Sequence, residues 1–224
     1  FNVGAGYIAG NGITTGSYNV AIGSHSLATT TTASNNTAVG SCALNKNTSG
    51  VDNVAMGTCA LDSNTTGSSN VAIGYSTLTT NTSAANNTAV GHLALRYNTA
   101  ANNTALGAAA LSANTTGGNN VAIGKGSMLA NTVGLANVSV GDGNMGSNTE
   151  GECNTSVGQG ALNANTTGDS NVSLGRQSLK SNTTASNNTA VGTFALCANT
   201  TGHSNVAVGY NVLASAVTGN ENTG

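Results

Sequence analysis

Cysteines and histidines are the residues of this chain best suited to redox or metal chemistry, and two cysteines have an informative spacing. Cys42 and Cys59 are 17 residues apart, which is also the interval at which the whole sequence repeats. Equivalent residues in adjacent coils of a stacked structure would have Cα atoms about 5 Å apart, within the range that a disulfide spans. The spacing leaves two hypotheses open: a disulfide or close thiol pair, or two small side chains that are not linked. Cys153 and Cys197 have no evident partner.

The remaining reactive side chains form no recognisable site. A zinc site needs about four converging ligands, and neither the cysteines nor the histidines have such a spacing. His25, His92 and His203 fall at three different positions of the repeat and are expected at the surface. Aspartate and glutamate never recur at one position, which argues against a calcium-binding β-roll. No nucleophile–base–acid set is apparent, so the sequence predicts a protein that is not an enzyme and that uses no metal or cofactor.

Threonine recurs once per repeat, and such a series could order water or contact a ligand if it lay on a flat outer face. It suggests an alternative function: an ice-binding or glycan-binding solenoid with a repeated Thr/Asn face. Only one unbroken series exists, and most of its members follow an Asn, a pairing typical of turns. A structural ladder is therefore the favoured interpretation. The series comprises Thr14, Thr31, Thr48, Thr65, Thr82, Thr99, Thr115, Thr132, Thr149, Thr166, Thr183 and Thr200.

All these residues must be positioned by a tandem repeat that runs through the chain. The stretch Asn-Val-Ala-Ile-Gly at residues 70–74 recurs so that its glycine falls every 17 residues, with one interval of 16 between Gly91 and Gly107. A fixed period of this length indicates a solenoid in which each repeat is one coil stacked on the last. We number the repeat from its Asn, position 1, to position 17. The sequence predicts an all-β parallel β-solenoid (β-roll) of about thirteen 17-residue coils, forming one domain over residues 1–224 with no terminal caps.

Positions 2 to 4 predict a short β-strand, because Val or Thr, a small residue and an aliphatic residue alternate there. Apolar residues, mostly Leu, recur at position 9, and Asn-Thr is typical of positions 12 and 13, so a second short strand is expected near positions 8 to 13. Turn residues follow at positions 15 to 17. Helix is the competing interpretation, but the glycine at position 5 and the many Asn, Ser and Thr residues leave no window long enough for a stable helix.

The five basic and seven acidic residues avoid positions 1 to 5, 8, 9, 12 and 13. Because burying an unpaired charge is costly, these positions are predicted to form the interior and the backbone ladder. The aliphatic side chains of positions 2, 4 and 9 are expected to supply the apolar core.

Asparagine occupies position 1 in every repeat. Identical amides stacked along one axis can bond donor to acceptor, and inward Asn side chains can satisfy buried backbone groups in turns. Glycine at position 5 is expected to adopt a backbone angle closed to other residues. The predicted structural ladder comprises Asn19, Asn36, Asn53, Asn70, Asn87, Asn103, Asn120, Asn137, Asn154, Asn171, Asn188 and Asn205.

Composition limits the partners that the chain can bind. The net charge is −2 and no basic patch exists, so no nucleic acid is expected as a partner. No apolar run approaches the roughly 18 residues that cross a bilayer, so no membrane span is predicted. Charged residues make up 5% of the chain and proline is absent, which is unlike most disordered sequences.

The Asn-Val-Ala-Ile-Gly element, followed by a small residue and Leu, resembles the head repeats of trimeric autotransporter adhesins. The Asn-Thr-Ala-Val-Gly, Ala-Leu and Asn-Thr-Thr-Gly elements resemble repeats of phage tail fibres and bacterial surface fibres. The resemblance covers essentially the whole chain, and the adhesins imply a left-handed β-roll, assembled as a homotrimer outside the cell and used for attachment. This chain differs in its longer repeat with an added Asn-Thr-Thr-Gly segment, so a wider coil that encloses its own core is the alternative to a trimer.

We therefore expect a non-catalytic structural subunit of an extracellular fibre or filament, on a cell or virion surface, that self-associates and takes part in adhesion. Self-association is expected end to end or as a homotrimer. The repeat runs to both ends of the sequence, which fits either end-to-end stacking or a fragment of a longer repeat protein. A surface glycan or host receptor is the candidate ligand, sought at the variable positions 6 and 7, which include Tyr75, His92, Leu93, Arg176, Phe194 and Tyr210.

Overall fold

The computed structural model describes all 224 residues and is an all-β parallel β-solenoid of about thirteen coils, each of roughly 17 residues, with no helix. Each coil contributes one three-residue strand at positions 2 to 4 of the repeat, which confirms the predicted strand. The strands are β1 (Val3–Ala5), β2 (Val20–Ile22), β3 (Thr37–Val39), β4 (Val54–Met56), β5 (Val71–Ile73), β6 (Thr88–Val90), β7 (Thr104–Leu106), β8 (Val121–Ile123), β9 (Val138–Val140), β10 (Thr155–Val157), β11 (Val172–Leu174), β12 (Thr189–Val191) and β13 (Val206–Val208).

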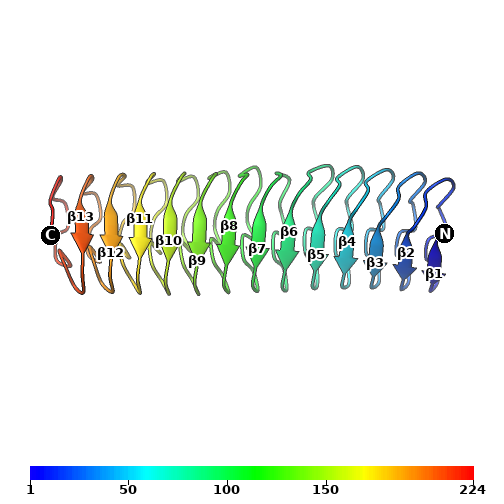
Figure 1. Ribbon diagram of the computed structural model, residues 1–224, viewed down its shortest axis with the longest axis horizontal. Helices are drawn as coiled ribbons and strands as arrows, with labels where there is room; N and C mark the ends of the chain where they lie inside the picture. Colours follow the sequence, from blue (N-terminus) through cyan, green and yellow to red (C-terminus); the bar gives the residue numbers. More distant parts are fainter. The chain divides into compact units, whose positions relative to one another are not determined.

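The chain forms two compact units, Phe1–Ala109 and Ala110–Gly224. In the first unit, β1 to β7 pair in parallel, each strand with the next along the chain (Figure 1). In the second unit, β8 to β13 pair in the same way. The register advances by one coil, so that Val54 pairs with Val71, and like residues stack in continuous files along each unit. The single domain expected over residues 1–224 stays a prediction.

The small middle residue of each strand except β1 faces the interior, while its neighbours, Val or Thr at position 2 and an aliphatic residue at position 4, face outward. Ala72 at position 3 has no exposed surface, whereas Ile73 at position 4 is 37% exposed. The prediction that positions 2 and 4 supply the apolar core is therefore wrong. Alternate residues of a strand point to opposite faces, so the buried alanine directs both neighbours outward. Position 3 also lies close to position 8, since the Oγ atoms of Ser173 and Ser178 are 2.6 Å apart, and this leaves room for small side chains only.

Leucine at position 9 forms the apolar core, as predicted. These side chains have no exposed surface, and methionine takes the place of leucine in two coils of the second unit. None of the twelve charged side chains is buried, which confirms that the charged positions form the solvated surface. The core file of the first unit comprises Leu27, Leu44, Leu61, Leu78 and Leu95, and that of the second unit comprises Leu111, Met128, Met145, Leu162, Leu179 and Leu196.

No second strand forms at positions 8 to 13, so that prediction is wrong. The residues at positions 7 and 9 have positive φ, for example +58° at Cys42 and +50° at Leu44, which turns the chain rather than extending it. Neighbouring coils still bond to each other there, since the N–H of Leu44 donates to the carbonyl of Ala60 over 3.0 Å. Backbone pairing between coils therefore continues without the extended geometry of a strand.

Candidate functional site

The asparagine ladder at position 1 exists, and all twelve predicted side chains are buried. Asn53 shows its geometry. Its backbone N–H and its Nδ2 both donate to Oδ1 of Asn36, over 3.0 and 3.1 Å. Its own Oδ1 accepts the same two bonds from Asn70, over 3.0 and 3.1 Å. Each such amide joins its coil to both neighbours, and from Asn19 to Asn70 the file forms an unbroken chain of side-chain hydrogen bonds.

A second asparagine ladder runs along position 12, and sequence reasoning did not identify it. Nδ2 of Asn64 donates to Oδ1 of Asn47 over 3.0 Å and to the carbonyl of Gly67 over 2.9 Å. The same carbonyl accepts Nδ2 of Asn53 over 2.9 Å. The two ladders therefore bind one shared backbone oxygen at position 15. The signal for this ladder in the sequence is the recurrence of Asn at position 12, which resembles the recurrence of Asn at position 1.

Hydroxyl groups of the threonine file at position 13 donate hydrogen bonds to backbone carbonyls of the next coil. Oγ1 of Thr48 donates to the carbonyl of Thr65 over 3.0 Å, and Oγ1 of Thr65 donates to that of Thr82 over 2.9 Å. A hydroxyl that already donates within the stack is less available to order outside water. This geometry favours the structural interpretation of the threonine series over a water-ordering face.

The single 16-residue coil, residues 87–102, leaves a local defect in the ladders. Nδ2 of Asn98 donates to the carbonyl of Ala100, two residues on, whereas Asn64 reaches the residue three on. Nδ2 of Asn87 is buried without a partner. The missing residue falls in the turn after position 12, so it displaces the oxygen that both ladders share, while β6 and β7 remain in register.

Cys42 and Cys59 lie at the same position of adjacent coils and are free thiols in the structure, as are Cys153 and Cys197. Burial raises the pKa of the Cys59 thiol, and the neighbouring Cys42 and the Asp62 carboxylate raise it further. The 42–59 disulfide therefore stays a prediction. His25 occupies the same position in the coil before Cys42, but no cluster of three or more His, Cys, Asp or Glu side chains is arranged to hold a metal ion.

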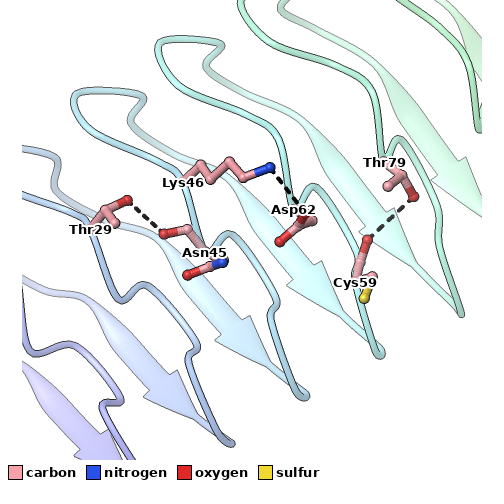
Figure 2. A network of polar contacts seen from close by, with 6 residues as sticks. All are labelled: Thr29, Asn45, Lys46, Cys59, Asp62 and Thr79. Atoms are coloured by element: carbon pink, nitrogen blue, oxygen red, sulfur yellow. Dashed lines mark hydrogen bonds and ion pairs between the residues drawn. The ribbon is translucent and has the colours of Figure 1, made fainter.

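Outer side chains around Cys59 also connect adjacent coils (Figure 2). Nζ of Lys46 lies 3.6 Å from Oδ2 of Asp62, and Oγ1 of Thr79 donates to the carbonyl of Cys59 over 3.4 Å. An exposed ion pair contributes about 0–1 kcal/mol. The cohesion of the coils thus depends on the interior ladders far more than on these outer contacts.

Oxidation is expected to join Cys42 and Cys59. A mild oxidant such as diamide accepts the two electrons and two protons of the thiols, and one S–S bond forms between neighbouring coils. Closing a loop of this size stabilises the fold by about 3 kcal/mol in the chain-entropy model. Because the thiolate is the attacking species, the raised pKa of Cys59 predicts slow oxidation near neutral pH that becomes faster as the pH rises. Peptide mapping by mass spectrometry and urea unfolding measure the two effects.

The matched control for oxidation is Cys42→Ser, which should show neither the cross-linked peptide nor the gain in stability. Pairing of Cys59 with Cys153 or Cys197, with no peptide joining it to Cys42, would contradict the expected stacking of position 7.

Serine replaces alanine at position 3 in three consecutive coils of the second unit, and the three hydroxyls differ in their partners. Ser173 bonds to Ser178, and Ser139 accepts the hydroxyl of Ser127 over 2.7 Å. Ser156 Oγ is buried without a partner. This hydroxyl is a local cost to stability, because a buried polar group that makes no hydrogen bond has lost its water and gained nothing.

Ser156→Ala is expected to raise the free energy of unfolding by about 1 kcal/mol, because it removes the unpartnered hydroxyl and restores the alanine that other coils carry. Ser173→Ala is the matched control and should lower stability, since it breaks the bond to Ser178. Urea unfolding followed by circular dichroism measures both. A loss of stability in Ser156→Ala equal to that in Ser173→Ala would show that the Ser156 hydroxyl is satisfied in solution.

Side chains at positions 6 and 7 form two groups on the surface. Tyr75 and His92 stack with ring centroids 5.5 Å apart and an interplanar angle of 14°. In the second unit, the Arg176 guanidinium lies 5.6 Å from the ring centre of Phe194, and Phe194 lies edge-on to Tyr210 with centroids 6.3 Å apart. The structure contains no pocket, so these are open surface clusters.

No helix of the length and apolarity needed to cross a membrane is present.

The outer face of the sheet in each unit is an apolar surface that sequence reasoning placed inside. It consists of an aliphatic residue at position 4 in nearly every strand and of position 2, which is Val in eight strands and Thr in five, without a charged residue. In the first unit, Ile22 and Leu106 are 42% and 47% exposed, and in the second unit Val157 and Val208 are 41% and 59% exposed. We name these surfaces the outer sheet faces.

Comparisons with protein-family models, with curated proteins and with solved structures gave no match. The structure alone therefore describes the chain, as a parallel β-solenoid with coils of about 17 residues and asparagine ladders.

Proposed function

We propose that this protein is a non-catalytic structural subunit of an extracellular fibre, and that it self-associates through its outer sheet faces. The observation that carries the proposal is the apolar, charge-free character of these faces in both units. Monomeric soluble proteins rarely expose contiguous apolar patches larger than a few hundred Å², and larger ones generally mark interaction sites.

A second copy of the same chain is the partner that fits this surface best. Both files of an outer sheet face repeat with every coil, for instance Val54 and Met56 in β4 and Val71 and Ile73 in β5. Two copies therefore present the same spacing to each other, and side chains of one can interdigitate with those of the other at each coil. No charge on the strands would repel a like copy.

The interior of the coils supports a mechanical role. Within each unit, most coils are bonded to the next through two asparagine ladders, a threonine ladder and backbone hydrogen bonds, and these bonds oppose bending and local opening. The repeat resemblance to adhesin heads and tail fibres supports a place on a cell or virion surface and a part in attachment. The surface location and the part in attachment both belong to the proposal.

Lysine substitution on the outer sheet faces tests self-association. The wild-type chain should form oligomers in analytical ultracentrifugation and fibres or bundles in electron micrographs. Ile73→Lys combined with Val157→Lys should give monomers, because each placed charge would be buried unpaired between copies. Thr58→Lys is the matched control, since Thr58 is exposed at position 6, where Lys125 already lies, and it should assemble like the wild type.

Circular dichroism establishes that each variant remains folded. A wild-type chain that stays monomeric at high concentration would overturn the proposal. Filaments that persist in the doubly substituted chain would do the same, because they would show that growth proceeds end to end without the outer sheet faces.

A further inference from the structure

Both arginines of the chain lie over aromatic rings, and one of them belongs to a larger exposed cluster. Arg96 Cζ is 4.9 Å from the centre of the Tyr97 ring. Arg176 Cζ is 5.6 Å from that of Phe194, which in turn meets Tyr210. We name Gln159, Arg176, Phe194 and Tyr210 the arginine–aromatic cluster; it spans four consecutive coils of the second unit.

The guanidinium in this cluster is held in place, yet most of its donors remain free. Nε of Arg176 donates to Oε1 of Gln159 over 3.3 Å, and the ring of Phe194 supports the guanidinium from one side. The one ion pair of the structure joins Lys46 to Asp62, so no carboxylate neutralises Arg176. The two terminal nitrogens keep N–H groups for a ligand, in the fork that matches a carboxylate.

The aromatic side chains supply the apolar part of a binding surface. Tyr210 is 75% exposed, and Phe194, whose ring meets both Tyr210 and Arg176, is half-buried. Aromatics make up only 3% of the chain, so two adjacent rings beside an unpaired arginine are a marked concentration. An exposed, partly amphipathic ring such as that of tyrosine provides a flat face and a hydroxyl, which suits the C–H face and the hydroxyl groups of a pyranose ring.

We infer that the arginine–aromatic cluster binds an acidic saccharide, one with a carboxylate on its sugar ring. The carboxylate receives the terminal N–H groups of Arg176, the sugar ring stacks on Tyr210, and the Gln159 amide donates to a neighbouring hydroxyl. The site lies at positions 6 and 7, outside the strand residues at positions 2 to 4 that form the outer sheet faces. The inference therefore goes beyond self-association and does not depend on it.

Isothermal titration of the full chain with a galacturonate oligosaccharide tests the inference, with the methyl-esterified form as the neutral probe. The wild type should bind the acidic oligosaccharide at least tenfold more tightly than the neutral one. Arg176→Gln should abolish that preference, and Tyr210→Ala should weaken binding of both probes. Lys180→Gln is the matched control, because it removes one exposed positive charge from the same coil, and it should bind like the wild type.

Four results would overturn the inference. The wild type could fail to bind the acidic probe, or bind both probes equally. Arg176→Gln could bind like the wild type. Equal losses in Arg176→Gln and Lys180→Gln would show a general charge effect without a site. Circular dichroism on each variant excludes unfolding as the cause of a loss.

Discussion

Asn53→Ala is expected to destabilise the first unit by about 4 kcal/mol, since the side chain takes part in four hydrogen bonds, each with a net contribution near 1 kcal/mol. The loss falls on both neighbouring coils. Asn70 would lose the acceptor of its buried backbone N–H and one of the two acceptors of its Nδ2. Oδ1 of Asn36 would lose the Nδ2 donor and keep the backbone N–H of residue 53. Alanine at this site also leaves a cavity inside a coil that has no spare space.

Hydrogen exchange locates this effect as well as measuring it. The backbone amide of Asn70 donates to Oδ1 of Asn53 in the wild type, so its exchange should accelerate most in Asn53→Ala. The carbonyl of Gly67 would lose the Asn53 donor and keep the Asn64 donor. Amides of the second unit should change little, since coils in a repeat protein interact mainly with their neighbours.

Two variants control the interpretation of Asn53→Ala. Asn45→Ala is the matched surface change. The hydroxyl of Thr29 donates to the backbone carbonyl of residue 45, which alanine also has. The substitution should therefore alter the free energy of unfolding by less than about 0.5 kcal/mol. Asn53→Asp keeps the shape but cannot donate to Gly67 near neutral pH, so it should be at least as damaging as alanine. An Asn53→Ala chain as stable as Asn45→Ala would show that the ladder contributes nothing net.

The solenoid itself was predictable because each coil meets the same physical demands. An asparagine that bonds to the equivalent asparagine in both neighbouring coils must occupy the same position in each repeat. A glycine that is required because the next coil lies too close for a Cβ atom must also recur at a fixed position. The asparagine ladder at position 1 and the buried leucine at position 9 followed from that recurrence, and both are present.

The direction in which the strands face could not be obtained from alternation alone. A strand such as Val71–Ile73 alternates equally well with its outer pair inside or outside, and a shift of one residue exchanges the two faces. The usual expectation places the larger apolar residues inside. Here the deciding fact is the width of the coil, since positions 3 and 8 face each other closely, and only Ala, Ser or a similar side chain fits.

The missing second strand has a comparable cause. Leucine rarely adopts a positive φ, so its recurrence at position 9 favoured an extended segment. In the structure, Leu61 has φ +52° and Leu78 has φ +50°. Burial of the whole side chain and the backbone bonds to the next coil stabilise that conformation. The positive φ of these leucines could be predicted only from the packing of the coils, because the local backbone preference of leucine does not indicate it.

Gly74→Ala is the second large effect that we expect, a loss of about 4 kcal/mol or more. Gly74 has φ +133°, a conformation that costs a non-glycine residue about 1–3 kcal/mol. A Cβ atom there would also lie 2.6 Å from the backbone carbonyl oxygen of Gly91 in the next coil. Neither atom can rotate away, because the backbone fixes the positions of both. The coils would have to separate locally, which weakens the neighbouring strand pairs. Thermal unfolding and urea titration measure the loss.

Gly67→Ala separates the two causes. A Cβ at Gly67 would crowd the carbonyl of Ala84 at least as closely, but the φ of Gly67 lies outside the positive range. Alanine already occupies the same position of the repeat at residues 33, 84 and 185, so a coil can shift to accept it there. Gly67→Ala should therefore lose about 1 kcal/mol, within the usual range for a point substitution. Equal losses at the two glycines would mean that crowding between coils, and not the positive φ, requires glycine at position 5.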